Sequence, residues 1–154
     1  MAVPAGLRVE LPHEMVFPHG FLASSVEADL DFNAPKDGDR QTRDKVTGKR
    51  VWVVAGMDMD PDASRFGRSS SVKVKVLADH MPVLPASPLP GYPPLVEFVE
   101  LQITPYLDER KCQPPRDGKS HRCRAQMVYS FRATGVREPS TMPVPVPGPA
   151  SEVA

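Results

Sequence analysis

The sequence predicts an all-β domain, folded as a small antiparallel barrel. Hydrophobic residues alternate with polar ones in several segments, and no run has the period of a helix. The chain of 154 residues also holds 19 prolines. An internal proline removes a helix hydrogen bond and clashes with the preceding turn, which excludes a helical bundle. A β-sandwich is the alternative.

The central strands have the clearest patterns. In Ser71–Leu77 three valines face one way, and Lys73 and Lys75 face the other. Arg50–Met57 is apolar on both faces, which indicates a strand covered on two sides.

A strand near the end of the domain, residues 129–134, alternates between apolar and polar side chains in the same way. Tyr129 lies in its apolar phase, and Arg132 in the outward phase.

Two other segments are expected to be strands. Leu95–Tyr106 changes phase, so we predict a β-bulge near Phe98 and Val99 that keeps both apolar sets inside. In Phe21–Leu30 we expect four side chains to point inward, namely Leu22, Val26, Ala28 and Leu30.

The connections agree with this assignment. Lys45–Gly48 is a predicted turn between a polar strand, Arg40–Asp44, and the strand that starts at Arg50. Met81–Pro94 holds six prolines and is expected to be a loop, and Asp108–Arg124 a long polar hairpin loop. Five or six antiparallel strands at this spacing favour an OB-like Greek-key barrel that lacks the usual helix of that fold.

The sequence divides into three parts. Residues 1–12 are expected to be a flexible N-terminal segment, and residues 13–137 the single barrel domain. Residues 138–154 are rich in proline and are expected to form a disordered, extended tail that buries nothing.

Charge sums to zero but is unevenly distributed. Nineteen Lys and Arg balance nineteen Asp and Glu, which excludes a binder of nucleic acid that is basic as a whole. Residues 36–77 nevertheless carry about +4 and residues 110–137 about +7. On a barrel these blocks could form one basic face with interleaved aromatics, as in proteins that hold single strands. The candidate nucleic-acid-binding residues are Lys49, Arg50, Trp52, Lys73, Lys75, Arg124, Tyr129 and Arg132. The alternative is that Trp52 and Tyr129 belong to the core and the charges form an ordinary solvated surface.

Catalytic and cofactor motifs are absent from the sequence. It has neither a Gly-x-Ser-x-Gly elbow nor a glycine-rich phosphate loop, so we expect no enzymatic activity and no cofactor. Cys112, His121 and Cys123 could supply three zinc ligands, but their spacing matches no standard zinc knuckle. A fourth ligand is not evident, although His80 or His13 could approach in space. The two cysteines could equally pair across a hairpin under oxidation. We therefore predict no bound metal.

The sequence predicts a cytoplasmic protein with no membrane association. Residues 1–12 lack the basic and apolar regions of a secretory signal, and the longest apolar run, Val51–Met57, is too short to cross a membrane. In that compartment Cys112 and Cys123 are expected to be thiols.

Several segments together resemble a known family. They are Glu14–Gly20, Arg43–Trp52 with the following Asp58–Pro61, Val96–Tyr106 and Tyr129–Gly135. In this order and spacing they resemble the actinomycete activators of plasmid replication, integration and excision, the Pra-like regulators of Streptomyces integrative conjugative elements. The resemblance covers residues 10–137, and Lys111–Arg124 departs from it as an apparent insertion.

The resemblance implies a regulator that activates the replication, excisionase and integrase genes of a mobile element. It implies no enzymatic activity and carries over no DNA-contact residues. The expected partner is DNA, as promoter duplex or single strand, or a protein of the replication and excision machinery. The alternative function is an OB-type single-strand-binding module that acts in replication.

Overall fold

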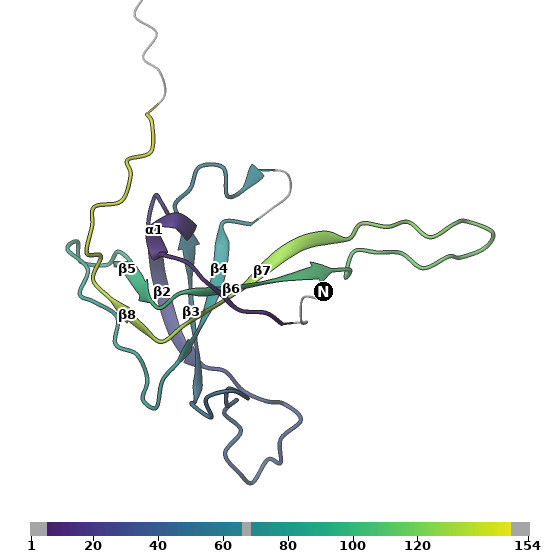
Figure 1. The fold of residues 1–154 in the computed structure, drawn as a ribbon, viewed down its shortest axis with the longest axis horizontal. Coiled ribbons are helices and arrows are strands. Elements are labelled where there is room, and N and C mark those ends of the chain that lie inside the picture. Colours follow the sequence, from purple (N-terminus) through teal and green to yellow (C-terminus); the bar gives the residue numbers. More distant parts are fainter. Residues whose placement is uncertain (1–5, 66–68, 149–154) are drawn as a thin grey trace, which may run out of the picture.

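The computed structural model describes residues 6–65 and 69–148, which form eight strands and one short helix (Figure 1). In chain order the elements are β1 (Val9–Glu10), α1 (His13–Val16), β2 (Phe21–Ala28), β3 (Val51–Asp58), β4 (Ser71–Leu77), β5 (Leu95–Val99), β6 (Gln102–Asp108), β7 (Gln126–Ala133) and β8 (Gly135–Arg137). The predicted all-β class is confirmed, and Met81–Pro94 forms a loop as expected.

The strands form one curled sheet in the order β1-β6-β7-β4-β3-β2-β5-β8, a half-barrel. Neighbouring strands are antiparallel except β4 and β7, which run parallel, so the purely antiparallel prediction is wrong at that pair. A parallel pair needs a crossover. Here β5 and β6 provide it, since the chain leaves β4, passes through both and returns beside β4 as β7.

The curl of the sheet follows from the junction between β5 and β6. These strands lie near opposite ends of the sheet order, yet only Glu100 and Leu101 separate them in sequence. The two ends of the sheet must therefore approach each other.

The predicted bulge near Phe98 is wrong, because the strand instead breaks at Glu100, whose φ is 50°. The break has the effect expected of the bulge, since Phe98 before it and Leu101 after it are both buried.

A bulge does occur in β2. The register against β3 shifts between Ala23 and Ser25, and the Ser24 hydroxyl donates a hydrogen bond to the Ala55 carbonyl (3.0 Å). Before the bulge, Phe21 and Ala23 point into the core. After it, Val26 packs against the same core.

The inward phase predicted for this segment is therefore wrong in part. Leu22 is only half-buried and Ala28 is exposed. Leu30 lies beyond the end of β2 and is 45% exposed.

The core is centred on three phenylalanine rings. Phe21 lies 5.1 Å from Phe17 and 5.0 Å from Phe98, measured between ring centroids. Val74 and Val76 of β4 are fully buried beneath them, as the alternation in Ser71–Leu77 predicts.

Residues 29–50 form a long excursion between β2 and β3. The predicted turn is confirmed: Gly48 has a φ of 72°, and its amide donates to the Asp44 carbonyl (2.8 Å). The predicted strand Arg40–Asp44 is wrong, because this segment makes only isolated bridges, at Gln41 and Arg43.

The N-terminal segment predicted to be flexible is in part a strand. Val9 and Glu10 pair with Ile103 and Gln102 of β6, and residues 1–5 lie outside the described residues.

The proline-rich tail is extended, as predicted, but it does contact the body. The Val144 amide donates to the Pro18 carbonyl (2.8 Å), and Ser140 donates to the Glu97 carboxylate. These hydrogen bonds reach as far as Val144, and residues 149–154 of the tail lie outside the described residues.

Candidate nucleic-acid interface

The most prominent feature of the molecule is the connection between β6 and β7, residues 109–125, which projects from the sheet as a long ribbon (Figure 1). We call it the arm. Bridges at Gln113–Arg122 and Arg116–Lys119 join its two sides. At its tip Asp117 and Gly118 have φ values of 46° and 75°, the signature of a type I′ turn.

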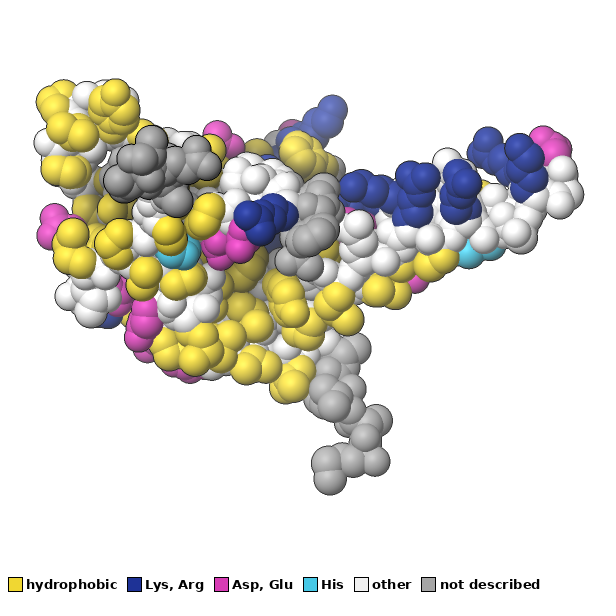
Figure 2. All heavy atoms as spheres, turned by 90° about the horizontal axis from the view of Figure 1, so that it is seen from above, with side chains coloured by type: hydrophobic (Ala, Val, Ile, Leu, Met, Phe, Trp, Pro, Cys, Tyr) yellow, Lys and Arg dark blue, Asp and Glu magenta, His cyan; other side chains and the backbone are white. Residues whose placement is uncertain are grey.

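The arm is strongly basic. Its cationic residues are Arg110, Lys111, Arg116, Lys119, Arg122 and Arg124, against Glu109 and Asp117. Figure 2 shows Lys and Arg side chains in a row along one edge of the arm. Of the six cations only Arg110 has an ion-pair partner among the described residues, Asp108 at 2.7 Å. The other five are therefore available to a polyanion.

Arg110 and Asp108 fix the base of the arm. Arg110 donates two side-chain hydrogen bonds and its amide to the carboxylate, at 2.7–3.1 Å. These bonds lower the pKa of Asp108 to about 2, with the Arg110 side chain the largest cause. This acid is therefore charged and paired at neutral pH.

A second basic feature lies on the body, in a hollow that we call the basic hollow. It is lined by the cations Arg8, Arg43, Lys45, Lys75 and Arg132, by Thr42 and Val51, and by a single carboxylate, Asp44. Such a surplus of positive charge in a hollow attracts anions.

Asp44 is already committed within the protein. Arg8 donates to it at 2.7 Å, and the amide and hydroxyl of Thr47 donate at 2.9 and 3.0 Å. These contacts, the Arg8 hydrogen bond first, lower the pKa of the buried Asp44 to about 2. Its charge offsets Arg8. Of the other cations, Arg43 lies 3.5 Å from Asp39 and Lys75 lies 3.6 Å from Asp29, so Lys45 and Arg132 are the ones without an ion pair among the described residues.

Arg132 is one of three half-buried cations of this hollow, with Arg8 and Lys75. Burial lowers the pKa of its guanidinium, and the nearby charge of Arg8 lowers it further. Its one hydrogen bond among the described residues goes to the Ser130 hydroxyl, at 3.4 Å. A phosphate here would relieve the repulsion between the two guanidinium groups.

The structure brings together only some of the predicted site residues. Lys75 and Arg132 are register partners of the β4–β7 pair and line the basic hollow together. Lys73 is exposed two residues along β4, and Arg124 lies on the arm. Lys75 is also 3.6 Å from Asp29.

The cations of the excursion are less available than predicted. Arg50 is held by Asp39 at 3.1 Å and by the Gln41 side chain at 2.9 Å. Lys49 is exposed beside the turn and does not line the basic hollow.

The two aromatic candidates do not lie among these cations. Trp52 packs against the core, and its Nε1 donates to the Ala78 carbonyl at 3.0 Å. Tyr129 is 52% exposed and shares the phase of Phe131, opposite to that of Arg132. The expected basic face with interleaved aromatics is not formed by these residues.

Sequence reasoning missed three of the five cations of the basic hollow. Arg43 and Lys45 lie within the basic block around the predicted turn, which was a usable signal. Arg8 gave none, because it reaches Asp44 only through the pairing of β1 with β6.

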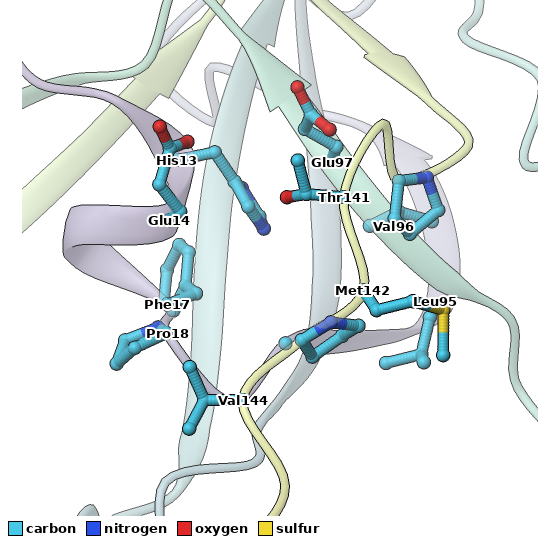
Figure 3. Close-up of a pocket in the computed structure, with 13 residues that line it drawn as sticks. His13, Glu14, Phe17, Pro18, Leu95, Val96, Glu97, Thr141, Met142 and Val144 are labelled. Atoms are coloured by element: carbon cyan, nitrogen blue, oxygen red, sulfur yellow. The ribbon is translucent and has the colours of Figure 1, made fainter.

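Figure 3 shows a different hollow, between α1, β5 and the tail. Thr141, Met142 and Val144 of the tail form one wall. Opposite them, His13 accepts a hydrogen bond from the Phe98 amide at Nδ1 (3.1 Å), and burial lowers its pKa. A neutral histidine bonded to the backbone fits a structural role, so we interpret this hollow as the place where the tail seats.

Comparison with protein-family models, curated proteins and solved structures finds no match to this chain. None of the helices in the described residues has the length and apolar character needed to span a membrane.

Proposed function

We propose that this protein is a non-enzymatic, cytoplasmic regulator of a mobile genetic element and that it binds duplex DNA through the arm. The observation that carries the proposal is a two-stranded ribbon bearing five cations without ion-pair partners in the described part of the chain. The resemblance of residues 10–137 to the Pra-like activators supports the regulatory role, the activation of replication, integration and excision genes.

The form of the arm suits a duplex. The major groove of B-DNA, about 12 Å wide, admits a two-stranded β-ribbon. Arginine can bind phosphates and can also contact guanine edges with two hydrogen bonds. Three of the five available cations are arginines, and Arg116 adjoins the tip.

The basic hollow supplies a second contact for the DNA backbone. Its half-buried Arg132 lies on β7, the strand into which the arm leads. Phosphate contacts at the arm and at the basic hollow would set the orientation of the duplex, while side chains of the arm contact the base edges.

Duplex is favoured over single strand because of where the two predicted aromatic contacts, Trp52 and Tyr129, lie. Single-strand binding by barrels uses aromatic side chains on which bases stack. Trp52 is packed and hydrogen-bonded within the protein, and Tyr129 faces away from the side that carries Arg132.

Fluorescence anisotropy with labelled oligonucleotides tests the binding proposal. The purified protein is titrated into a promoter duplex of its element and into the single strand of the same sequence. We expect tighter binding to duplex, and a loss of at least about tenfold when Arg116, Lys119, Arg122 and Arg124 are all changed to Ala. A matched control changes Lys36 and Arg65, exposed cations outside the arm, and should bind as the wild type does.

Two outcomes contradict this proposal. Equal affinity of the arm variant and the control for duplex would show that the arm does not bind the DNA. Preference for the single strand would instead favour the replication-module alternative.

A reporter assay tests the regulatory part separately. Expression of an excisionase promoter fusion should rise with the wild-type protein and not with the arm variant at matched protein levels. If the protein binds no nucleic acid but forms a stable complex in pull-downs from lysate, an adaptor role replaces direct DNA binding.

A further inference from the structure

Three metal-ligating side chains meet on the arm, although they are separated in sequence. The ligand atoms of Cys112, His121 and Cys123 all lie within 4.8 Å of one another. We propose that these three residues form a zinc-binding site. The proposal stands apart from DNA binding, since it rests on the donor atoms and the register of the ribbon.

The register of the arm places the two cysteines face to face. Gln113 and Arg122 exchange both backbone hydrogen bonds, each 3.1 Å long. The next pair toward the body, Cys112 opposite Cys123, is therefore a non-hydrogen-bonded pair, in which side chains approach most closely. His121 lies two residues before Cys123, and period two places it on the same face of the ribbon.

The spacing of the donor atoms fits tetrahedral zinc after a small adjustment. Zinc bonds of about 2.0–2.3 Å place ligand atoms about 3.3–3.8 Å apart. The ligand atoms already lie within 4.8 Å of one another, so movements of about 1 Å bring them to this separation. Rotation of the exposed side chains of His121 and Cys123 can supply these movements.

The surroundings of Cys112 support a metal-bound thiolate. The Arg124 amide donates to the Cys112 sulfur at 3.3 Å, which is the outer contact that orients a sulfur ligand. The group contains no carboxylate. Two sulfurs and an imidazole select zinc over magnesium or calcium, which prefer oxygen.

Charge balance also favours this metal. Binding would release the two thiol protons to solvent, and the two thiolates would neutralise Zn²⁺. The site would then add no positive charge to an arm already crowded with cations. His121 and Cys123 are exposed, so water completes the tetrahedron.

A bound zinc ion would link the two sides of the arm between its base and its tip. It would hold the ribbon in one register and fix the row of cations. The predicted absence of metal rested on sequence spacing, which does not reveal which residues of a hairpin lie opposite each other.

Metal content and cobalt substitution test the site in the full-length protein. The protein is reduced, freed of metal by chelation, returned to an oxygen-free buffer, and titrated with Zn²⁺ or Co²⁺. We expect one metal per chain, with the thiolate-to-cobalt charge-transfer bands and intense visible bands of tetrahedral Co²⁺. Cys112→Ser and Cys123→Ser should abolish these bands, and His121→Ala should weaken binding at least about tenfold. His80→Ala, an exposed histidine outside the arm, is the matched control.

Limited trypsin digestion gives a second measurement. Zinc should slow cleavage after Arg122 and Arg124 several-fold in the wild type and leave the rate unchanged in Cys112→Ser. Far-UV circular dichroism checks that the variants keep the β-sheet.

The proposal is overturned if the reduced protein takes up no stoichiometric zinc. It is equally overturned if Cys112→Ser and Cys123→Ser bind the metal as the wild type does. A Cys112–Cys123 disulfide whose reduction restores no metal binding would assign the pair to redox chemistry instead.

Discussion

Glu97 joins three parts of the molecule through one buried carboxylate. It lies in β5, and its Oε1 accepts from the Arg137 guanidinium of β8 at 2.6 Å. Its Oε2 accepts from the amide and hydroxyl of Ser140, at the start of the tail, at 2.6 and 2.7 Å. The Ser140 amide is the largest cause that lowers the pKa of Glu97 to about 2.

The first prediction concerns the pH dependence of stability. The pKa of Glu97 falls from 4.5 to about 2 on folding, so between these values the unfolded chain binds more protons. The stabilisation is complete above pH 4.5 and is lost as the pH falls toward 2. Glu97→Gln should cost about 1–3 kcal/mol at pH 7 and flatten this dependence, as measured by urea unfolding at pH 7 and pH 3.

Glu27→Gln is the control for this experiment, because Glu27 is an exposed carboxylate of the same type. It should leave the free energy of unfolding at pH 7 within about 0.5 kcal/mol of the wild type. An acid transition as steep in Glu97→Gln as in the wild type would contradict the role of this carboxylate.

A second prediction follows from Gly56 in β3. A Cβ at this position would collide with the Leu22 carbonyl oxygen and the Phe21 ring. Neither can move freely, since one belongs to the β2 backbone and the other to the packed core. Gly56→Ala should therefore cost about 3 kcal/mol or more in free energy of unfolding.

Gly38→Ala provides the comparison for Gly56. Its φ is not in the left-handed region, and the nearest atom to a new Cβ is the Pro35 carbonyl at 4.0 Å. This variant should lie within about 0.5 kcal/mol of the wild type. Equal stability of the two alanine variants in thermal or urea unfolding would show that β2 and β3 pack more loosely than described.

At the scale of the elements, the arm is separate from the fold that carries it. Its side chains are exposed except for Cys112 and Ala125, and none contributes to the core. Asp108 and Gln126 are register partners at its base. The arm therefore extends from a strand pair that can close without it.

A third prediction follows from this separation. Replacing residues 109–125 by Asn-Gly should close β6 and β7 with a two-residue type I′ turn. The shortened protein should unfold with a midpoint close to that of the wild type in thermal denaturation, while losing most affinity for duplex DNA. A large loss of stability would show that the arm contributes to the sheet.

The alternation of apolar and polar residues predicted the strands that bury one face. It did not predict the buried face correctly where a strand bulges or changes its neighbours. Ser71–Leu77 was predicted correctly because its valines alternate with lysines around a single buried face. The break at Glu100 could not be predicted from the sequence. A β-bulge and a break between two strands shift the alternation of apolar residues in the same way. In β2, the bulge at Ser24 reverses the phase that the sequence indicates.

The same limit applies to the candidate site. Lys75 and Arg132 were found because both lie in the polar phase of an alternating strand. For Trp52 the core alternative is confirmed, since it packs against the core and its pairing partner, Val76, is buried. The approach of Arg8 to Asp44 depends on the long-range pairing of β1 with β6. That of Cys112 to Cys123 is local to the arm, and the sequence left it open as a pairing across a hairpin.

At the scale of the whole molecule, a net charge of zero coexists with concentrated positive charge. Acidic residues elsewhere balance the arm in the total, but among the described residues only Asp108 pairs with one of its cations, Arg110. Screening at physiological salt confines such fields to about 8 Å. A ligand at the arm therefore senses the local cations far more than the neutral whole.

The salt dependence of duplex binding is the decisive measurement for the arm, because it counts the phosphates that the protein neutralises. The logarithm of the association constant is measured against the logarithm of salt concentration, for the wild type and for the variant with Arg116, Lys119, Arg122 and Arg124 changed to Ala. We predict a linear wild-type plot, with a slope reduced by about 3–4 in the variant, close to 0.9 for each phosphate that is no longer neutralised. Identical slopes for the two proteins would contradict the assignment of the arm as the DNA-binding element.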